Sequence, residues 1–360
     1  MAVSCKLKPV IDSLRLQHFR SYKDESFEFE PGVNIVVGPN ASGKTNLLEA
    51  VLMLARGSSF KARDSDLVQF NKPWARLDGY FGRQNRSVKL VLEDTKVDKS
   101  FLLEDKPYRR LSLERTVPVV IFEPNHLQLI TRGPEQRREY VDDLLERSLP
   151  GFKALAGNYR RTLAQRNALL KYQPAQATRQ LFAWDVRLSE LGGKIAAARQ
   201  ELVDQINKNL SRTYNQIAGG RAGAKILYDC HFPAGSYASK MLSKLQASNA
   251  VDFARGFTAH GPHREDISFY LNKKLVGQTA SRGETRSLLL ALKIFELGLV
   301  EKARGQKPIL LLDDVFSELD GARRHALVDH LKNHQTIITT TDAEATLEYF
   351  QTGDYKVIAL

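Results

Sequence analysis

Hydrophobic and polar positions alternate with a period of two along much of the first third of the chain. Residues 11–19 and 26–29 alternate in this way and are bounded by polar residues. Runs of the same kind lie at 76–81, 87–92 and 100–103, separated by charged turns. Successive side chains of a strand point to opposite faces, so these runs predict β-strands buried on one face.

Three other runs are almost entirely apolar, at residues 32–37, 117–122 and 308–314. Unbroken apolar runs of this length are typical of strands covered on both faces, as in parallel sheets. We expect residues 117–122 to be a central strand, with Pro118 near its start. Residues 336–342 predict a further strand, which ends in hydroxyl side chains.

Apolar positions three and four residues apart predict helices at 46–55, 135–148 and 152–170. One face of the third comprises Phe152, Leu155, Tyr159, Leu163, Arg166 and Leu170. The longest stripe runs through Leu181, Trp184, Leu188, Leu191, Ile195, Ala198, Leu202, Ile206, Leu210, Tyr214 and Ile217. We expect this stripe to end at Gly219 and to pack against helices of its own lobe, with a short projecting hairpin as the alternative.

One loop carries a complete phosphate-binding pattern, formed by Gly38, Pro39, Asn40, Ala41, Ser42, Gly43, Lys44 and Thr45. It lies between a predicted buried strand and a predicted helix that begins near Asn46, which we include among the nucleotide-binding residues. In such a loop, backbone N–H groups and the helix N-terminus bind phosphate. The lysine contacts the β- and γ-phosphates, and the hydroxyl binds Mg²⁺. The sequence therefore predicts a nucleotide site.

The apolar run at 308–314 ends in Asp313 and Asp314. An acid that ends a strand next to a phosphate-loop strand holds Mg²⁺, so we assign Asp313 to the metal and Asp314 to the attacking water. Lys44 and Asp313 are 269 residues apart, although we expect the strands that precede them to share one sheet. We therefore predict that residues 1–120 and 300–360 form one α/β lobe, and that 121–299 form a mainly helical inserted lobe. Within the latter, residues 225–259 give the weakest pattern, with a strand at 225–228 and a helix at 238–247.

Composition restricts the class of protein and its partners. The 360 residues carry a net charge of +12, which favours a polyanionic partner such as nucleic acid or an anionic membrane surface. The two cysteines, Cys5 and Cys230, are far apart in sequence, which argues against a disulfide framework or a cysteine zinc site. No apolar segment is long enough for a signal peptide or a membrane span. We expect a cytoplasmic protein.

Two further segments near the C-terminus complete the set of nucleotide-site motifs. Residues 281–284 precede a long amphipathic helix, and residues 317–320 follow the acidic strand at once. With the phosphate loop, they resemble the head of an ABC-type P-loop ATPase. In that class the segment corresponding to Ser281, Arg282, Gly283 and Glu284 closes over the γ-phosphate held by a second subunit. The resemblance implies ATP and Mg²⁺ as cofactors, an ATP-dependent head-to-tail homodimer, a catalytic role for Ser281 and nucleotide contacts from Asp320.

More specific blocks are spread in order over nearly the whole chain. They comprise residues 14–22, 45–50, 57–64, 133–142, 261–266, 281–284 and 312–320, of which Gly261-Pro262-His263-Arg264 is the most distinctive. The chain closely resembles the RecF family of SMC-like DNA-repair ATPases. The resemblance implies a weak, DNA-stimulated ATPase that binds single-strand/double-strand DNA junctions in recombinational repair and replication-fork maintenance. It also implies RecO and RecR as partners in loading RecA.

Several positions depart from these patterns. The RecF family usually has Gln at the position of Glu284. ABC transporters have Glu at the position of Asp314, and the shorter aspartate side chain suits slow hydrolysis. The usual magnesium-binding Gln is not evident, and Gln128 is preferred over Gln136. Lys61 and Arg63 follow the first helix, where SMC heads place a basic residue near the γ-phosphate or DNA. We select Arg63 for the nucleotide, and a solvated basic turn is the competing interpretation. His260 and His263 have no acid or cysteine at metal-ligand spacing, which favours a structural or DNA-facing role.

Basic residues recur along the predicted helical lobe, and acids are absent from residues 159–179. The candidates for DNA phosphate contact are Arg137, Arg138, Arg160, Arg161, Arg166 and Lys171. A solvated helix face is the competing interpretation. Neither a recognition helix nor an aromatic platform is evident, so we expect little sequence preference.

Three other functions share parts of these patterns. An SMC-class chromosome-organising protein would need helical arms longer than the stripe from Leu181 to Leu202, which spans about three heptads. An ABC transporter motor would need a membrane-domain partner, and its inserted lobe would be shorter. A nuclease of the overcoming-lysogenization type would need a catalytic domain beyond the ATPase.

Overall fold

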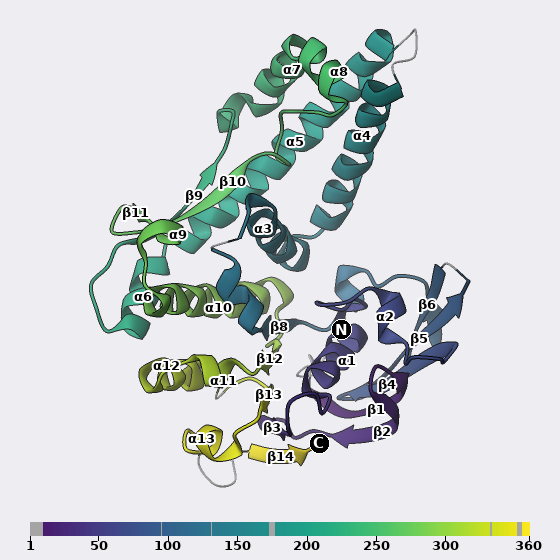
Figure 1. Cartoon of the computed structure of the whole chain (residues 1–360), viewed down its shortest axis with the longest axis vertical. Coiled ribbons are helices and arrows are strands. Elements are labelled where there is room, and N and C mark those ends of the chain that lie inside the picture. Colours follow the sequence, from purple (N-terminus) through teal and green to yellow (C-terminus); the bar gives the residue numbers. More distant parts are fainter. Residues whose placement is uncertain (1–9, 95, 131, 173–176, 332, 351–354) are drawn as a thin grey trace, which may run out of the picture. The chain divides into compact units, whose positions relative to one another are not determined.

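The computed structural model describes residues 10–94, 96–130, 132–172, 177–331, 333–350 and 355–360 (Figure 1). The chain divides into two compact units, Met1–His126 with Leu289–Leu360, and Leu127–Leu288. None of the helices in the described ranges is long and apolar enough to cross a bilayer. Cys230 is a free thiol, whereas Cys5 lies outside the described residues.

A parallel sheet organises the first unit. In the described ranges its strand order is β14-β3-β13-β12-β8, and every neighbouring pair is parallel. The strands are β3 (Val33–Val37), β8 (Val119–Phe122), β12 (Ile309–Asp313), β13 (Thr336–Thr340) and β14 (Tyr355–Ala359). Because parallel strands all end at the same edge, the residues after β3, β8, β12 and β13 meet there.

Strand β8 corrects one expectation from the sequence. It pairs only with β12 among the described strands and so lies at the edge of the sheet, not at its centre. All four of its residues are nevertheless buried. An edge strand covered on both faces is as apolar as a central one, so hydrophobicity alone does not distinguish the two.

An antiparallel sheet forms the second layer of this unit, in the order β2-β1-β4-β5-β6-β7. Its strands are β1 (Ile11–Phe19), β2 (Tyr22–Glu28), β4 (Trp74–Phe81), β5 (Gln84–Glu93), β6 (Lys96–Leu103) and β7 (Lys106–Tyr108). Helix α1 (Lys44–Arg56) contacts strands of both sheets, and its residues 47–55 are all buried. A Cβ on Gly79 would lie 2.8 Å from Leu54, so glycine in β4 allows this close approach.

Short helices and the end of a longer one complete the first unit. They are α2 (Asp64–Leu67), α11 (Val315–Glu318), α12 (Gly321–Leu331), α13 (Ala343–Leu347) and α10 (Arg282–Arg304), which begins in the second unit. The buried side chain of Gln335 links the two sheets. It accepts from Ile11 N at 2.7 Å and donates to Ile11 O at 2.7 Å and Glu30 O at 2.8 Å.

The second unit is mainly helical. Its helices are α3 (Pro134–Ser148), α4 (Phe152–Tyr172), α5 (Ala177–Asn207), α6 (Leu210–Ala218), α7 (Tyr237–Ala247), α8 (Asn249–Arg255) and α9 (Val276–Thr279). A three-stranded sheet joins them, formed by β9 (Ala224–Asp229), β10 (Asp266–Leu271) and β11 (Lys274–Leu275). Helix α5 packs against α3, α4, α7 and β9 of its own unit.

The stripe expected to form one helix up to Gly219 is two helices. Residues 208–209 form a turn between α5 and α6. Because both helices pack on β9, the apolar period continues across the turn. The sequence pattern therefore gives no indication of the turn. Side chains beside the turn complete the edge of β9: Asn207 bonds both N and O of Ile226, and Ser211 both N and O of Ala224, at 2.8–2.9 Å.

Arg166 corrects a predicted DNA contact. Its side chain is fully buried between α4, α5 and α8, where it donates to Asp185 at 2.6 Å, Asp252 at 2.7 Å and Thr258 at 2.9 Å. A guanidinium this deep cannot reach a DNA phosphate, and its carboxylate partners compensate for its lost hydration. Its position on the apolar face of α4 predicted this burial better than its charge predicted exposure.

His263 has a structural role. Its Nδ1 is 2.7 Å from the hydroxyl of Tyr159 and its Nε2 is 3.1 Å from Thr258 O. Burial lowers the pKa of His263 to about 4. The described residues contain no group of three or more His, Cys, Asp or Glu side chains suited to a metal.

We expect His263 to make the folded protein sensitive to acid. Its folded-state pKa lies below the ordinary value of 6.5, so the unfolded chain binds a proton that the folded chain does not. Stability is therefore retained above pH 6.5 and falls between pH 6.5 and about 4, by up to ~1.4 kcal/mol per pH unit. Urea unfolding at pH 7.5 and 5.5 should show a smaller loss for His263→Gln than for the wild type. Equal losses would contradict this role, and His325→Gln is the control.

Candidate nucleotide site

The loop between β3 and α1 has the backbone of an anion cradle. Gly43 has φ 108° and Ala41 has φ 67°, so the chain turns its N–H groups inward at the start of α1. The hydroxyl of Tyr22 donates to Gly43 O at 3.0 Å, and a Cβ on Gly43 would lie 2.9 Å from that hydroxyl. Glycine is therefore required for both the φ angle and the contact.

Lys44 and Ser42 supply the side-chain donors of this loop. The ammonium of Lys44 curls over the loop and donates to Gly38 O at 2.7 Å and Pro39 O at 2.9 Å, and the residue is 5% exposed. The hydroxyl of Ser42 is buried and has no hydrogen-bond partner in the described part of the chain. The first N–H groups of α1 lack intrahelical acceptors. This donor set fits the phosphates of a nucleotide.

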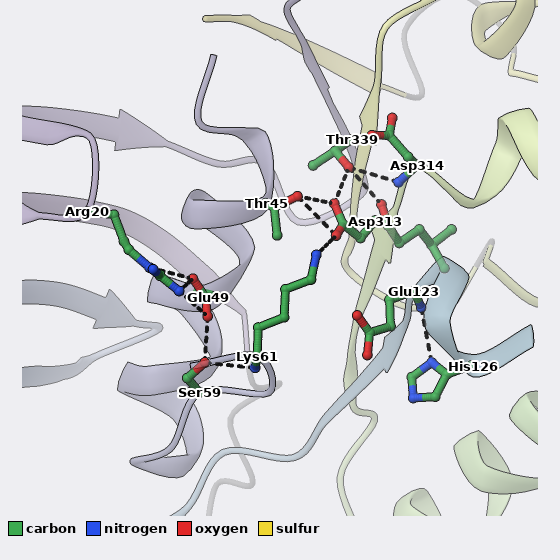
Figure 2. A network of polar contacts seen from close by, with 11 residues as sticks. Arg20, Thr45, Glu49, Ser59, Lys61, Glu123, His126, Asp313, Asp314 and Thr339 are labelled. Carbon is green, nitrogen blue, oxygen red and sulfur yellow. Dashed lines mark hydrogen bonds and ion pairs between the residues drawn. The ribbon is translucent and has the colours of Figure 1, made fainter. Parts of the chain in front are cut away.

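Oxygen ligands for a hard cation meet beside the cradle (Figure 2). Thr45 Oγ1 is 2.9 and 3.0 Å from the two carboxylate oxygens of Asp313, which is 3% exposed. Thr339 Oγ1 is 3.0 Å from Asp313 Oδ1. These residues come from α1 and from the ends of the neighbouring strands β12 and β13, and hydroxyl and carboxylate oxygens are the donors that Mg²⁺ prefers.

Asp314 is held at the same edge by its backbone. Its N–H donates to Thr339 Oγ1 at 3.0 Å, and its φ of 51° places it in the left-handed region. Burial, together with the charge of Asp313, raises the pKa of Asp314, while Lys44 and Lys61 oppose the rise. A carboxylate with a raised pKa is a better proton acceptor, as the water-activating role requires. Thr339 contacts both acids and orients them. The sequence analysis did not single it out, and the hydroxyl residues at 336–341 were the only feature that could have indicated it.

Lys61, rather than Arg63, reaches this cluster. Its Nζ lies 3.5 Å from Asp313 Oδ2. Arg63 is exposed and directly precedes α2. Glu123, which the sequence did not single out, follows β8 one position beyond the Phe122–Leu312 pair and is therefore the register neighbour of Asp313. Figure 2 shows its carboxyl group on the Lys61 side of β12.

The predicted signature segment forms a capping box at the start of α10. Ser281 Oγ accepts from Glu284 N at 3.2 Å, and Glu284 Oε2 accepts from Ser281 N and Oγ, each at 2.8 Å. The backbone hydrogen bond from Ser281 lowers the pKa of Glu284. Ser281 and Glu284 are exposed in the second unit, whereas the phosphate loop belongs to the first. The nucleotide roles of Ser281, Arg282, Gly283 and Glu284 stay predictions.

The other predicted site residues differ in their solvent exposure and hydrogen-bond partners. Asp320 is exposed, and its carboxylate accepts from Arg323 N at 3.0 Å. Asn46 donates from its amide to Ser21 at 3.0 Å. Gln128 is exposed in the second unit, so its role as a metal ligand stays a prediction.

The remaining DNA candidates fall into two groups. Arg160, Arg161 and Lys171 are exposed on α4. Arg137 instead forms a two-point ion pair with Asp266, and the Arg138 guanidinium donates to a backbone carbonyl. The α4 residues are therefore the more accessible candidates for phosphate contact.

Comparisons with known proteins place this geometry in a family. The model of the RecF/RecN/SMC N terminal domain matches residues 10–353. Proteins named "DNA replication and repair protein RecF" from Heliobacterium modesticaldum and a Synechococcus species are 34% and 35% identical to this chain. The first alignment covers 93% of each chain, and the second covers 91% of this chain and 90% of the relative.

Comparison with solved structures gives the same family and fold. One of "the recombination mediator protein RecF-ATPrS in RecFOR pathway" aligns with a TM-score of 0.85 and 28% identity, and covers 94% of both chains. A structure of an SMC head bound to a domain of ScpA has a TM-score of 0.55 at 16% identity, which concerns the fold alone.

The fold and the site define the class as an ABC-type ATPase head of the SMC-like kind. A parallel sheet joins the phosphate loop to the strand that ends in Asp313, and a mainly helical unit is inserted between them. The chain belongs to the RecF family.

Proposed function

We propose that this protein is a cytoplasmic, ATP-gated DNA-binding switch of recombinational repair and replication-fork maintenance. The observation that carries the proposal is the meeting of the Lys44 cradle with Thr45 and Asp313 at one sheet edge. Relatives named for DNA replication and repair, together with a relative solved in an ATP-bound form, support it. The +12 net charge is compatible with a nucleic-acid partner.

Each residue of the edge has a role in this proposal. Lys44, Ser42 and the first N–H groups of α1 bind the phosphates, while Thr45 and Asp313 hold Mg²⁺, with Gln128 as a further candidate ligand. Bound Mg²⁺ supplies charge neutralisation between the β- and γ-phosphates. Asp314 orients and deprotonates water. The hydroxyl of Thr339 fixes Asp314 by accepting a hydrogen bond from the backbone N–H of Asp314. Lys61, whose Nζ lies 3.5 Å from Asp313 Oδ2, is the candidate contact to the terminal phosphate.

The switch is a dimer in this proposal. Ser281 of one copy closes over the γ-phosphate that the other copy holds, so two nucleotides bridge two identical subunits. The exposed Ser281 and the N-terminus of α10 provide donors suited to a terminal phosphate. Slow, DNA-stimulated hydrolysis removes the bridging phosphate and releases the partners. Because the Ser281 hydroxyl donates to Glu284 Oε2, it leaves that hydrogen bond when it donates to the phosphate.

DNA is bound through its backbone in this proposal. Arg160, Arg161 and Lys171 offer exposed charge without an accompanying base-reading element. The preferred substrate is a single-strand/double-strand junction or gap, where RecO and RecR assist in loading RecA. An SMC-class structural protein would need a far longer arm than α5, whose 31 residues span ~46 Å.

The deciding experiment measures dimer formation and DNA binding in parallel. Light scattering should show a monomer without nucleotide and a dimer with ATP and Mg²⁺. Fluorescence anisotropy should show tighter binding to gapped than to plain duplex DNA, and only when ATP is present. A protein that stays monomeric with ATP and ignores DNA would overturn the proposal.

Salt provides a further prediction for the DNA complex. Each phosphate neutralised by a lysine or arginine contributes about −0.9 to the slope of log affinity against log salt. We expect Arg160→Ala and Arg161→Ala each to lower the magnitude of this slope by about one, equally for unrelated sequences. Anisotropy titrations at several NaCl concentrations test this. An unchanged slope would remove these residues from the interface, and Arg187→Ala, on α5, is the matched control.

A further inference from the structure

The turn between α1 and α2 carries Lys61 and is anchored by Ser59. The Ser59 hydroxyl donates to Glu49 Oε1 at 2.5 Å. The same oxygen accepts from the backbone N–H groups of Lys61 and Ala62, each at 3.0 Å. One hydroxyl therefore fixes the backbone from which the Lys61 side chain extends.

Glu49 is in turn a rigid anchor. It is 1% exposed, and Arg20 holds its carboxylate through two nitrogens, at 3.0 and 3.2 Å. Arg20 lies in the turn between β1 and β2 with φ 52°. A buried carboxylate needs such charged partners, and a two-point guanidinium contact fixes its orientation.

The helical repeat explains why this anchor serves the nucleotide site. Thr45 and Glu49 are four residues apart on α1, so they lie on the same face of the helix, one turn apart. Thr45 contacts Asp313, and Glu49 holds the turn from which Lys61 returns to the same carboxylate. Figure 2 shows the continuous path from Arg20 through Glu49, Ser59 and Lys61 to Asp313.

We infer that Ser59 and Glu49 are positioning residues that hold the Lys61 ammonium on the terminal-phosphate side of the nucleotide site. The inference rests on the proposed function. A lysine on a mobile turn would lose backbone freedom as well as side-chain freedom when it is fixed on a phosphate. Fixing its backbone in advance leaves less freedom to lose when a phosphate binds, which is the general benefit of preorganisation.

Discrimination between triphosphate and diphosphate is the distinctive consequence. In this inference Lys61 contacts the terminal phosphate, which ADP lacks, whereas the Lys44 cradle serves both nucleotides. Loss of the Ser59 anchor should therefore weaken binding of a triphosphate while leaving ADP binding unchanged. A general loss of structure would weaken both equally.

The experiment compares dissociation constants for Mg²⁺ with ATPγS and with ADP, by calorimetry on the full chain. We expect Lys61→Ala to lower the preference for ATPγS about tenfold and Ser59→Ala to lower it about fivefold, in the range of one charged hydrogen bond. The double variant should be no worse than Lys61→Ala alone, because both act through one contact. Ser59→Thr keeps the hydroxyl and should restore the preference. Ser58→Ala, at the exposed neighbouring serine, is the control.

The outcomes separate this inference from the proposed function. A wild type that binds neither nucleotide overturns the proposed function itself. A wild type that prefers ATPγS, with Ser59→Ala retaining that preference or weakening both nucleotides equally, overturns only the inference. Glu49→Gln, which keeps the side-chain shape but removes the charge, is a second variant and should lower the preference in the same direction. Additive effects in the double variant would also overturn it.

Discussion

Lys44→Ala is expected to abolish ATP binding at micromolar concentrations and, with it, the ATP-dependent dimer. The Lys44 ammonium lies within the loop, 2.7 Å from Gly38 O and 2.9 Å from Pro39 O, and is almost fully buried. Charged hydrogen bonds contribute ~1.5–3 kcal/mol each. Losing the two that the ammonium is proposed to donate to the β- and γ-phosphates therefore weakens ATP binding by more than about a hundredfold. Calorimetry and light scattering with ATP and Mg²⁺ measure the two effects.

Mixing two defective variants gives a sharper test of the composite site. Ser281→Arg blocks the signature surface but leaves the phosphate cradle intact, whereas Lys44→Ala does the reverse. In a head-to-tail dimer, a mixture of the two recovers one complete site out of two, so some ATP-dependent dimer returns. Failure to recover any dimer would argue against the composite arrangement, while normal dimerisation of Lys44→Ala alone would remove Lys44 from the site. Lys72→Ala, at an exposed lysine, is the control.

Asp314→Asn is expected to slow ATP hydrolysis by about a hundredfold or more while ATP still binds. Asn keeps the shape and the backbone contact to Thr339 at 3.0 Å, but it cannot accept a proton. General-base catalysis contributes about 10²–10⁴ in rate. Because hydrolysis releases the partners, the ATP-bound dimer of this variant should also persist longer than the wild-type dimer.

Single-turnover hydrolysis and the calorimetric affinity for ATP, measured on the same preparation, test this expectation. Lost binding would mean that Asp314 supports the nucleotide rather than the water. A hydrolysis rate equal to that of the wild type would exclude the residue as a base. Asp66→Asn, an acid outside the site, is the control.

Local sequence was enough for the central elements of the site. Residues 38–45 determine a glycine-dependent turn followed by a helix, and this local geometry creates the anion cradle wherever it occurs. The unbroken apolar run before Asp313 predicts a buried strand, and an acid directly after such a strand must lie at the carboxyl edge of a parallel sheet. Strand β1 and helix α7 were predicted in the same way from their periods.

Local periods failed where two different environments give the same pattern. The α5–α6 turn is invisible because both helices face β9, and the edge position of β8 is hidden by its burial on both faces. Arg166 has the charge of a DNA contact and the helical position of a core residue. Only the carboxylates of Asp185 and Asp252, brought from other helices, make its burial possible.

By itself, the sequence determined that a phosphate cradle and an acidic strand exist and that a helical unit separates them. The tertiary structure alone decided which side chains of different elements meet there: Thr339 between the two acids, Lys61 beside Asp313, and the anchor from Arg20 through Glu49 to Ser59. The physical reason is that a backbone turn is specified by neighbouring residues. A contact between side chains of different elements, as of Lys61 with Asp313 or of Thr339 with Asp313, is specified by the register of the sheet and the packing of α1 between two layers.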